Sequence, residues 1–321
     1  MPTRHPAPPV FPARRNALKL IAGLSLAAAM PQLEAADMAP HQLQRRIPRS
    51  GELLTAMGLG TWQTFDVAGD AAGLTAVRET LRLFAVAGGR MVDSSPMYGS
   101  SEAVLGDTAG ALELQSALFF ATKVWTNGRD EGLRQMQTSI ERMKAKGGGR
   151  KHGMDLMQVH NLVDLATHLK TLRAWKAEGR IRYLGFTHYT VDSHRQLAEL
   201  IKKEQPDFVQ FNFSIATRNA EKALLAVAAD NQTAVIINRP FEEGDLFRTV
   251  RGKALPGFAA EIGCETWAQF FLKYILGHPA VTCVIPGTRE PRHLLDNMQA
   301  GTGVLPDWAM RERMAAYFDK L

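Results

Sequence analysis

The sequence predicts a single (β/α)8 barrel with a small N-terminal hairpin and one extra C-terminal helix. Between residues 45 and 300, eight short apolar runs alternate with segments of helical period, and no shift in composition marks a linker. The chain of 321 residues, 45% apolar and 22% charged, is long enough to bury a large core. An open doubly wound sheet is disfavoured, because Gly58 and Gly60 lack the third glycine of a phosphate-binding loop.

The predicted elements begin with a hairpin formed by residues 45–47 and 52–54. Strands are predicted at 57–61, 91–93, 119–123, 154–159, 181–186, 208–211, 234–237 and 281–285. Helices are predicted at 73–87, 102–112, 132–146, 165–178, 192–203, 220–230, 266–276 and 291–300, with the extra helix at 307–320. The connection 239–265 is longer than usual, which makes it a candidate cover for a ligand at the barrel mouth.

Residues 1–36 are set apart as a predicted export signal, which leaves 37–321 as the barrel. Arg14-Arg15 is followed by an apolar run of 11 residues, 20–30, and by small residues that suit cleavage. This order resembles a twin-arginine signal, although Ala17 stands where phenylalanine is common. The resemblance implies the twin-arginine export machinery as a partner and a periplasmic or otherwise exported protein. The alternative is a disordered tail with a chance apolar helix.

Composition excludes several other classes of partner. The formal net charge of +6 falls to +3 without residues 1–36, and no basic run is interleaved with aromatic residues, so nucleic-acid binding is not expected. No later segment approaches the roughly 18 apolar residues of a membrane-spanning helix. Cys264 and Cys283 are predicted to be buried and unpaired, and without histidines at ligand spacing they give no metal signature.

Polar side chains follow three of the predicted strands. Asp93 ends the second strand and Tyr98 follows it, while Lys123 ends the third strand and His160 follows the fourth. All strands of a parallel barrel open at their carboxyl ends onto one face, so these four side chains are predicted to converge there. Each residue taken alone is more often structural or solvated, and the prediction therefore rests on the set.

The four residues suit proton transfer to a carbonyl oxygen. A free tyrosine has a pKa near 10, and a nearby lysine favours the phenolate and is predicted to lower the pKa of Tyr98. Asp93 is expected to keep Lys123 charged and oriented. His160 is expected to orient a substrate carbonyl or to assist its protonation. The set contains no nucleophile and suits the arrival of hydride at the carbonyl carbon.

Four motifs together resemble the aldo-keto reductases over essentially residues 45–300. They are the segment 57–62 (MGLGTW), Asp93 with Tyr98-Gly99, Thr122-Lys123, and the segment 158–160 (QVH). The resemblance implies a (β/α)8 barrel that reduces an aldehyde or ketone to an alcohol, or the reverse, with a nicotinamide dinucleotide. It makes Tyr98 the general acid, tuned by Lys123 and Asp93, with His160 orienting the carbonyl. Trp62 and Trp125 are expected at the substrate mouth.

The cofactor positions resemble the family less completely. Thr187 and His188 stand where a Ser-Asn pair holds the nicotinamide carboxamide, and Gln210 matches the family's glutamine. The segment 237–241 (INRPF) lacks the usual aromatic residue, so stacking is either lost or supplied by Phe241. The adenosine-phosphate segment is predicted to use Thr288, Arg289, Arg292 and Asn297. NADPH is favoured, and NADH is not excluded.

Two other functions compete with this interpretation. A non-catalytic sensor or regulatory subunit with the same barrel is favoured by the altered nicotinamide contacts and by an oxidising compartment that is not expected to regenerate free NADPH. An unrelated carboxylate-based barrel hydrolase leaves Tyr98 and Lys123 unexplained. The intact proton-transfer set favours the reductase, while the substrate, the reaction direction and the oligomeric state are not encoded in these motifs.

Overall fold

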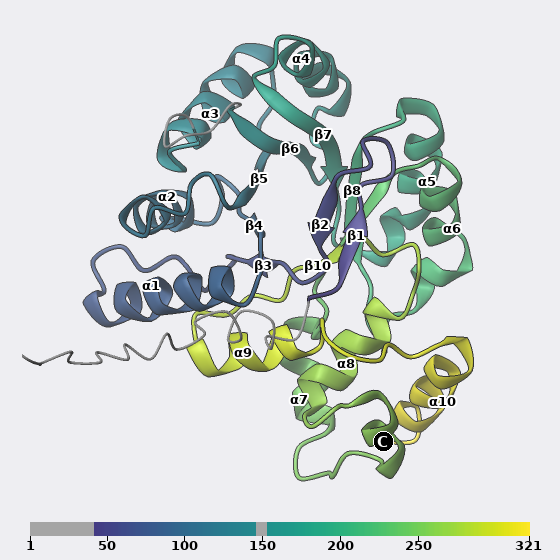
Figure 1. The fold of residues 1–321 in the computed structure, drawn as a ribbon. Coiled ribbons are helices and arrows are strands. Elements are labelled where there is room, and N and C mark those ends of the chain that lie inside the picture. Colours follow the sequence, from purple (N-terminus) through teal and green to yellow (C-terminus); the bar gives the residue numbers. More distant parts are fainter. Residues whose placement is uncertain (1–41, 146–152) are drawn as a thin grey trace, which may run out of the picture. The chain divides into compact units, whose positions relative to one another are not determined.

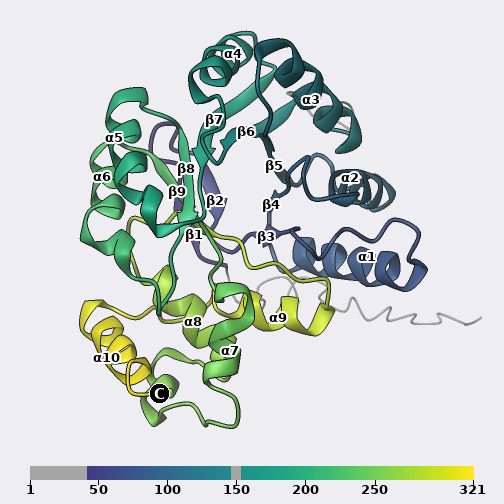
Figure 2. The ribbon, with the colours of Figure 1, turned by 180° about the vertical axis from the view of Figure 1, so that it is seen from behind.

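The computed structural model describes residues 42–145 and 153–321, which fall within the compact unit Pro40–Leu321. The predicted export signal, residues 1–36, lies outside the described residues. The described part is a parallel barrel ringed by helices (Figures 1 and 2). The predicted single (β/α)8 barrel with an N-terminal hairpin and an extra C-terminal helix is therefore confirmed.

Eight strands form the barrel in sequence order. They are β3 (Leu59–Gly60), β4 (Met91–Asp93), β5 (Phe119–Val124), β6 (Met154–His160), β7 (Ile181–Thr187), β8 (Phe208–Asn212), β9 (Ala234–Asn238) and β10 (Cys283–Val284). Each strand pairs in parallel with the next, and parallel bridges from Met57 to Val284 and from Gly60 to Gly287 join the first strand to the last. The sheet thus closes on itself.

Glycine makes this closure sterically possible. A Cβ atom on Gly60 would lie 2.8 Å from the Ile285 carbonyl oxygen, and one on Gly58 would lie 2.9 Å from Cys283 Sγ. Regular pairing between the first and last strands is short. The strands β3 and β10 therefore cover only two residues each of the predicted ranges 57–61 and 281–285. The predicted lengths of these two strands are wrong because apolar patterning does not show where pairing stops.

The helices alternate with the strands as predicted. They are α1 (Ala71–Val86), α2 (Ser101–Ala111), α3 (Arg129–Arg142), α4 (Leu165–Ala177), α5 (His194–Glu204), α6 (Leu224–Asp230), α8 (Trp267–Leu276) and α9 (Pro291–Gln299). The additional helix α10 (Trp308–Phe318) follows the barrel, and Asp307 caps its start by accepting from the Met310 amide at 2.8 Å. The predicted helix 132–146 instead begins at Arg129, where Asp130 and Glu131 suit a helix N-terminus.

The long connection 239–265 contains structure of its own. It holds α7 (Asp245–Thr249) and two 3-10 helices, Glu242–Gly244 and Gly257–Ile262. Three consecutive residues, Glu242, Glu243 and Gly244, have positive φ angles of 50°, 56° and 97°. The segment is therefore a tightly turned, folded insertion rather than an open loop.

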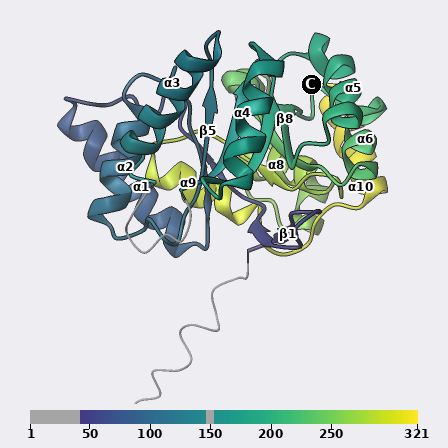
Figure 3. The ribbon, with the colours of Figure 1, turned by 90° about the horizontal axis from the view of Figure 1, so that it is seen from above.

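The hairpin of β1 (Gln44–Arg46) and β2 (Leu53–Thr55) lies at one end of the barrel (Figure 3). Ile47 and Leu54 are wholly buried and belong to the same apolar cluster as Phe119 and Tyr183 of the barrel interior. The phenol of Tyr183 also donates to Glu52 of the hairpin at 2.6 Å. The hairpin thus plugs the amino end of the barrel and leaves the carboxyl end for a site.

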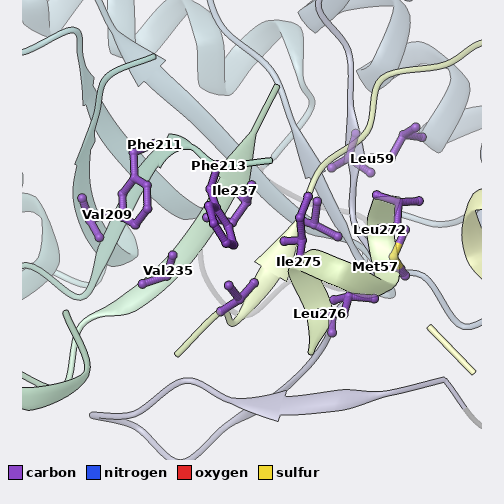
Figure 4. Packing of buried hydrophobic residues seen from close by; sticks show 14 of the residues in the cluster. Met57, Leu59, Val209, Phe211, Phe213, Val235, Ile237, Leu272, Ile275 and Leu276 are labelled. Carbon is purple, nitrogen blue, oxygen red and sulfur yellow. The ribbon is translucent and has the colours of Figure 1, made fainter. Parts of the chain in front are cut away.

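A second and larger apolar cluster lies between the sheet and its helices. Figure 4 shows part of this cluster, in which Ile275 of α8 joins Phe211 and Ile237 of the strands. Cys264 and Cys283 are both buried and free, as predicted. Among the described helices, none is long and apolar enough to cross a membrane.

Candidate active site

Alternation along the strands divides the barrel interior into an apolar part and a polar part. On β5, Phe119 and Ala121 belong to the interior apolar cluster, and Lys123 follows them at the same parity. The same order recurs on β6, where Leu156 precedes Gln158 and His160. Because parallel strands end at one rim, the polar residues gather there. They are Asp93, Lys123, Gln158, His160, Thr187, Gln210 and Asn238.

Asp93 and Lys123 form a buried ion pair at the centre of this rim. Lys123 Nζ donates to Asp93 Oδ2 and to the Ser94 carbonyl, both at 2.6 Å. The other carboxylate oxygen, Oδ1, accepts from Nε2 of Gln158 at 3.2 Å and from Nε2 of Gln210 at 3.1 Å. Burial acts to lower the pKa of Lys123, but the adjacent Asp93 carboxylate and Tyr98 outweigh it and raise that pKa. Lys123 is therefore a fixed ammonium.

Tyr98 lies beside this ammonium, with Lys123 Nζ 5.2 Å from the centroid of its ring. Burial raises the pKa of Tyr98, the Lys123 charge opposes that rise, and the Asp93 charge adds to it, so the net direction is upward. The prediction of a lowered pKa is wrong, because the sequence does not show that desolvation exceeds the effect of the lysine. Tyr98 is accordingly held as a protonated phenol, which is the form that a proton donor needs.

The loop that carries Tyr98 is fixed from outside the barrel by Asp66. The Asp66 carboxylate accepts from the Ser100 amide at 2.8 Å and from the Ser100 hydroxyl at 2.7 Å. Gly99, between Tyr98 and Ser100, has a φ of 58°, and a Cβ atom there would lie 2.3 Å from the Asp66 carboxylate. The glycine after Tyr98 therefore serves both the turn and the close approach of the carboxylate.

His160 faces Tyr98 across the rim. The two rings meet edge to face with centroids 6.2 Å apart, and the Trp125 ring lies 6.4 Å from His160. Nδ1 of His160 lies 3.3 Å from the Ser95 hydroxyl. Burial, helped by the charge of Lys123, lowers the pKa of His160 to about 3. The imidazole is therefore neutral near pH 7, where it acts as a hydrogen-bond donor rather than as a cation.

Two indoles mark the mouth of the site. Trp62 follows β3 and Trp125 follows β5, with 42% and 41% of their surfaces exposed. The backbone of Trp125 is held by the Gln135 side chain of α3, which accepts from the Trp125 amide at 2.6 Å and donates to its carbonyl at 3.2 Å. The structure thus places both predicted substrate residues at the carboxyl end of the barrel, with Trp125 next to His160.

Two of the predicted carboxamide residues, Thr187 and Gln210, form one connected group of side chains with Asn238, which was not predicted. The Thr187 hydroxyl donates to Gln210 Oε1 at 3.1 Å, while Gln210 Nε2 bonds Asp93. Nδ2 of Asn238 also donates to Gln210 Oε1, at 3.4 Å, and to the His188 carbonyl at 3.1 Å. We call Thr187, Gln210 and Asn238 the amide cluster. Gln210 is thus committed to Asp93, and its predicted role at a cofactor stays a prediction.

His188 and Phe241 lie at the margin of the amide cluster. Nδ1 of His188 accepts from the backbone amides of Tyr189 at 3.0 Å and Thr190 at 3.3 Å, so the imidazole caps its own turn. The ring of Phe241 packs on Phe247 with centroids 4.9 Å apart. No ring contact joins Phe241 to the amide cluster within the described residues, and its predicted stacking role stays a prediction.

The predicted phosphate residues surround the start of α9. The Thr288 hydroxyl accepts from the Glu290 amide at 3.0 Å, and the Arg289 carbonyl accepts from Thr80 of α1 at 2.8 Å. Arg289 is half-buried, Arg292 is exposed, and Asn297 is buried on α9. Neither guanidinium forms an ion pair within the described part of the chain. Both are thus available to an anion.

Three polar residues of the rim were not among the predicted site residues. Gln158 precedes His160 by two positions on the same strand, and Ser95 follows Asp93 by two, so the period of two was the signal for both. Asn238 occupies the position of the missing aromatic residue in the segment 237–241, and no motif assigned it a contact. Oε1 of Gln158 and Oδ1 of Asn238 are buried without a hydrogen-bond partner in the described residues.

Comparisons with known proteins find relatives in sequence and in fold. The NADH-specific methylglyoxal reductase of Escherichia coli is 25% identical over 233 residues, covering 64% of this chain and 69% of that protein. The pyridoxine 4-dehydrogenase of Escherichia coli is 25% identical over 244 residues, covering 71% and 80%. A crystal structure of an aldo-keto reductase from Klebsiella pneumoniae in complex with NADPH shares the fold, with a TM-score of 0.71, 20% identity, and coverage of 87% of this chain and 95% of that chain.

A family model matches more of the chain than either of these two relatives does. The model described as the aldo/keto reductase family matches residues 56–316, which is most of the chain and all of the barrel. The matched region contains the ion pair of Asp93 and Lys123 together with Tyr98 and His160. The protein belongs to the aldo/keto reductase family.

Proposed function

We propose that the protein is an NAD(P)H-dependent oxidoreductase that interconverts an aldehyde or ketone with its alcohol at the carboxyl rim of the barrel. The observation that carries the proposal is the buried Lys123–Asp93 pair at 2.6 Å beside the protonated phenol of Tyr98. A buried ion pair is costly unless it is fully bonded, and here Lys123 Nζ and both Asp93 oxygens have hydrogen-bond partners. The pair thereby holds a fixed positive charge beside the proton donor Tyr98.

The residues at the rim divide the proton chemistry among themselves. When bound, the nicotinamide supplies or accepts hydride at the substrate carbon. Tyr98 gives its proton to the carbonyl oxygen, and the Lys123 ammonium stabilises the phenolate that is left. Asp93 holds Lys123 in place, and His160 donates a second hydrogen bond to the same oxygen. Reversal of these roles oxidises an alcohol.

The amide cluster fits the carboxamide of a nicotinamide. Such a group has an acceptor oxygen and two N–H donors, and the cluster offers those donors two acceptors, the Thr187 hydroxyl oxygen and the unpaired, buried Oδ1 of Asn238. A buried acceptor without a partner is costly, so a donor is expected there when the site is filled. At the other end, Arg289 and Arg292 suit the phosphates of the adenosine half. NADPH is the cofactor favoured by these arginines, and NADH is not excluded.

Turnover of NADPH with a panel of aldehydes and ketones tests the proposal. Wild-type protein is expected to oxidise NADPH with at least one carbonyl class, and Tyr98→Phe is expected to reduce kcat by about 10²–10⁴-fold while NADPH binding is kept. Tight NADPH binding without hydride transfer to any carbonyl would instead favour the sensor. The family assignment and the complete proton-transfer set favour the enzyme.

We also propose that residues 1–36 direct the protein through the twin-arginine route. The support is the order of Arg14-Arg15, the apolar run 20–30 and the small residues that follow. This route permits the barrel to fold and load its cofactor before transport. The test is fractionation of cells that express the full chain or a variant with Arg14→Lys and Arg15→Lys. Export of the wild type alone supports the proposal, whereas equal export of both chains refutes it.

A further inference from the structure

The hydroxyl of Ser95 contacts His160 and is buried. The side chain of Ser95 is wholly buried, so its hydroxyl proton has no access to water. Nδ1 of His160, at 3.3 Å, is the sole hydrogen-bond partner of Ser95 Oγ within the described residues. A buried donor without an acceptor is costly, which makes Nδ1 the natural acceptor of the Ser95 proton.

The alternative assignment leaves a polar group unsatisfied. A neutral imidazole carries one proton, on Nδ1 or on Nε2. With the proton on Nδ1, His160 donates to Ser95 Oγ and the Ser95 hydroxyl proton has no acceptor in the described structure. With the proton on Nε2, the Ser95 hydroxyl donates to Nδ1, and both the hydroxyl proton and Nδ1 have a partner. The geometry thus selects between tautomers that the imidazole ring alone does not fix.

The second ring nitrogen is open toward the site. Nε2 of His160 makes no hydrogen bond to residues 42–145 or 153–321, and it is not among their buried unpaired atoms. It is therefore accessible, on a ring that lies edge to face with Tyr98. The pKa of His160 is about 3, so the ring is neutral near pH 7 and carries one N–H proton.

We propose that Ser95 is a positioning residue whose hydroxyl donates to Nδ1 of His160 and thereby holds the imidazole as the Nε2–H tautomer, the form that donates to a carbonyl oxygen. Ser95 is wholly buried and acts through His160. Its catalytic consequence rests on the proposed carbonyl chemistry, whereas the tautomer itself is a property of the protein alone.

The test is the ¹⁵N spectrum of the histidine side chains in the purified protein, with the His160 signals identified by their loss in His160→Gln. Wild-type protein is expected to show His160 as the Nε2–H tautomer near pH 7. Ser95→Ala is expected to shift the tautomer ratio toward Nδ1–H by up to about tenfold, the effect of losing one hydrogen bond of ordinary strength. Ser101→Ala is the matched control, because the buried Ser101 hydroxyl bonds only a backbone carbonyl, at 3.5 Å, within the described residues, and it is expected to leave the spectrum unchanged.

Activity supplies a second and separable readout. Ser95→Ala is expected to lower kcat for carbonyl reduction by up to about tenfold with little change in NADPH binding, and Ser95→Thr, which keeps a hydroxyl, is expected to restore the tautomer. A wild-type His160 in the Nδ1–H form, or an unchanged ratio in Ser95→Ala, overturns the inference. A tautomer shift in a protein that turns over no carbonyl would uphold the role of Ser95 and refute the proposed reaction.

Discussion

Lys123 Nζ lies 2.6 Å from Asp93 Oδ2, and both side chains are almost wholly removed from water. Removal of one partner of such a pair leaves an uncompensated buried charge. Lys123→Met is therefore expected to lower the free energy of unfolding by about 3–5 kcal/mol. The double variant Asp93→Asn with Lys123→Met is expected to recover most of this loss, because no isolated charge remains, yet to stay inactive. Denaturant unfolding and NADPH turnover measure the two effects.

The exposed pair of Glu79 and Arg82 provides the control for this experiment. Its atoms are 2.7 Å apart, about as close as those of the buried pair, but both side chains are close to half exposed. Arg82→Met is expected to change stability far less than Lys123→Met does, because solvent screens the exposed pair. An equally small change in Lys123→Met would contradict the assignment of Lys123 as a buried, compensated charge.

The titration of Tyr98 tests the direction of its pKa. Burial raises that pKa despite the nearby Lys123 ammonium, so phenolate is expected to form only above the ordinary tyrosine value of about 10. The ultraviolet difference titration between wild type and Tyr98→Phe isolates this one phenol. A midpoint below about 9 would show that the lysine outweighs desolvation, as the sequence alone suggested.

The sequence predicted the members of the proton-transfer set better than their energetics. Asp93, Lys123 and His160 end strands, or follow them directly, and the barrel rule brings strand ends together without knowledge of side-chain packing. The direction of the Tyr98 pKa depends on how completely the rim excludes water, which no spacing reveals. Helix positions followed from apolar periodicity, whereas the short pairing of β3 and β10 depended on steric closure at Gly58 and Gly60.

The cofactor half was less predictable for a related reason. Gln210 was identified from its motif, but its bond to Asp93 links the amide cluster to the buried ion pair, and only the three-dimensional network shows this. Ser95 contacts His160 through one hydrogen bond, and Asn238 donates to the His188 carbonyl and to Gln210. A sequence pattern of period two marks such residues as inward-facing without naming the partner they meet.

The stability of the protein is expected to depend on pH through His160. Its pKa is about 3 in the folded protein and 6.5 ordinarily, so below pH 6.5 the unfolded chain binds a proton that the folded protein does not. Stability contributed by this group is therefore present above pH 6.5 and is lost as the pH falls toward 3. At pH 4 the loss is about 3 kcal/mol. Unfolding curves of wild type and His160→Gln between pH 4 and 7 measure it, and a difference that does not vary with pH would contradict it.

Asn238 tests whether the amide cluster holds the nicotinamide. If its unpaired Oδ1 accepts from the carboxamide, wild-type protein is expected to bind NADP⁺ about 5- to 100-fold more tightly than an analogue with an acetyl group, which lacks the N–H donor. Asn238→Leu is expected to reduce that preference toward unity by weakening NADP⁺ binding alone. Calorimetric titration measures the four affinities.

Binding of 2′,5′-ADP separates a local contact at Asn238 from a general loss of structure. This fragment carries the phosphates expected at Arg289 and Arg292 but has no nicotinamide, so Asn238→Leu is expected to leave its affinity unchanged. Asn238 also donates to the His188 carbonyl and to Gln210, and a disturbed rim would weaken every nucleotide. Equal weakening of NADP⁺, the acetyl analogue and 2′,5′-ADP would therefore identify Asn238 as a structural residue, whereas selective loss for NADP⁺ places its Oδ1 on the carboxamide.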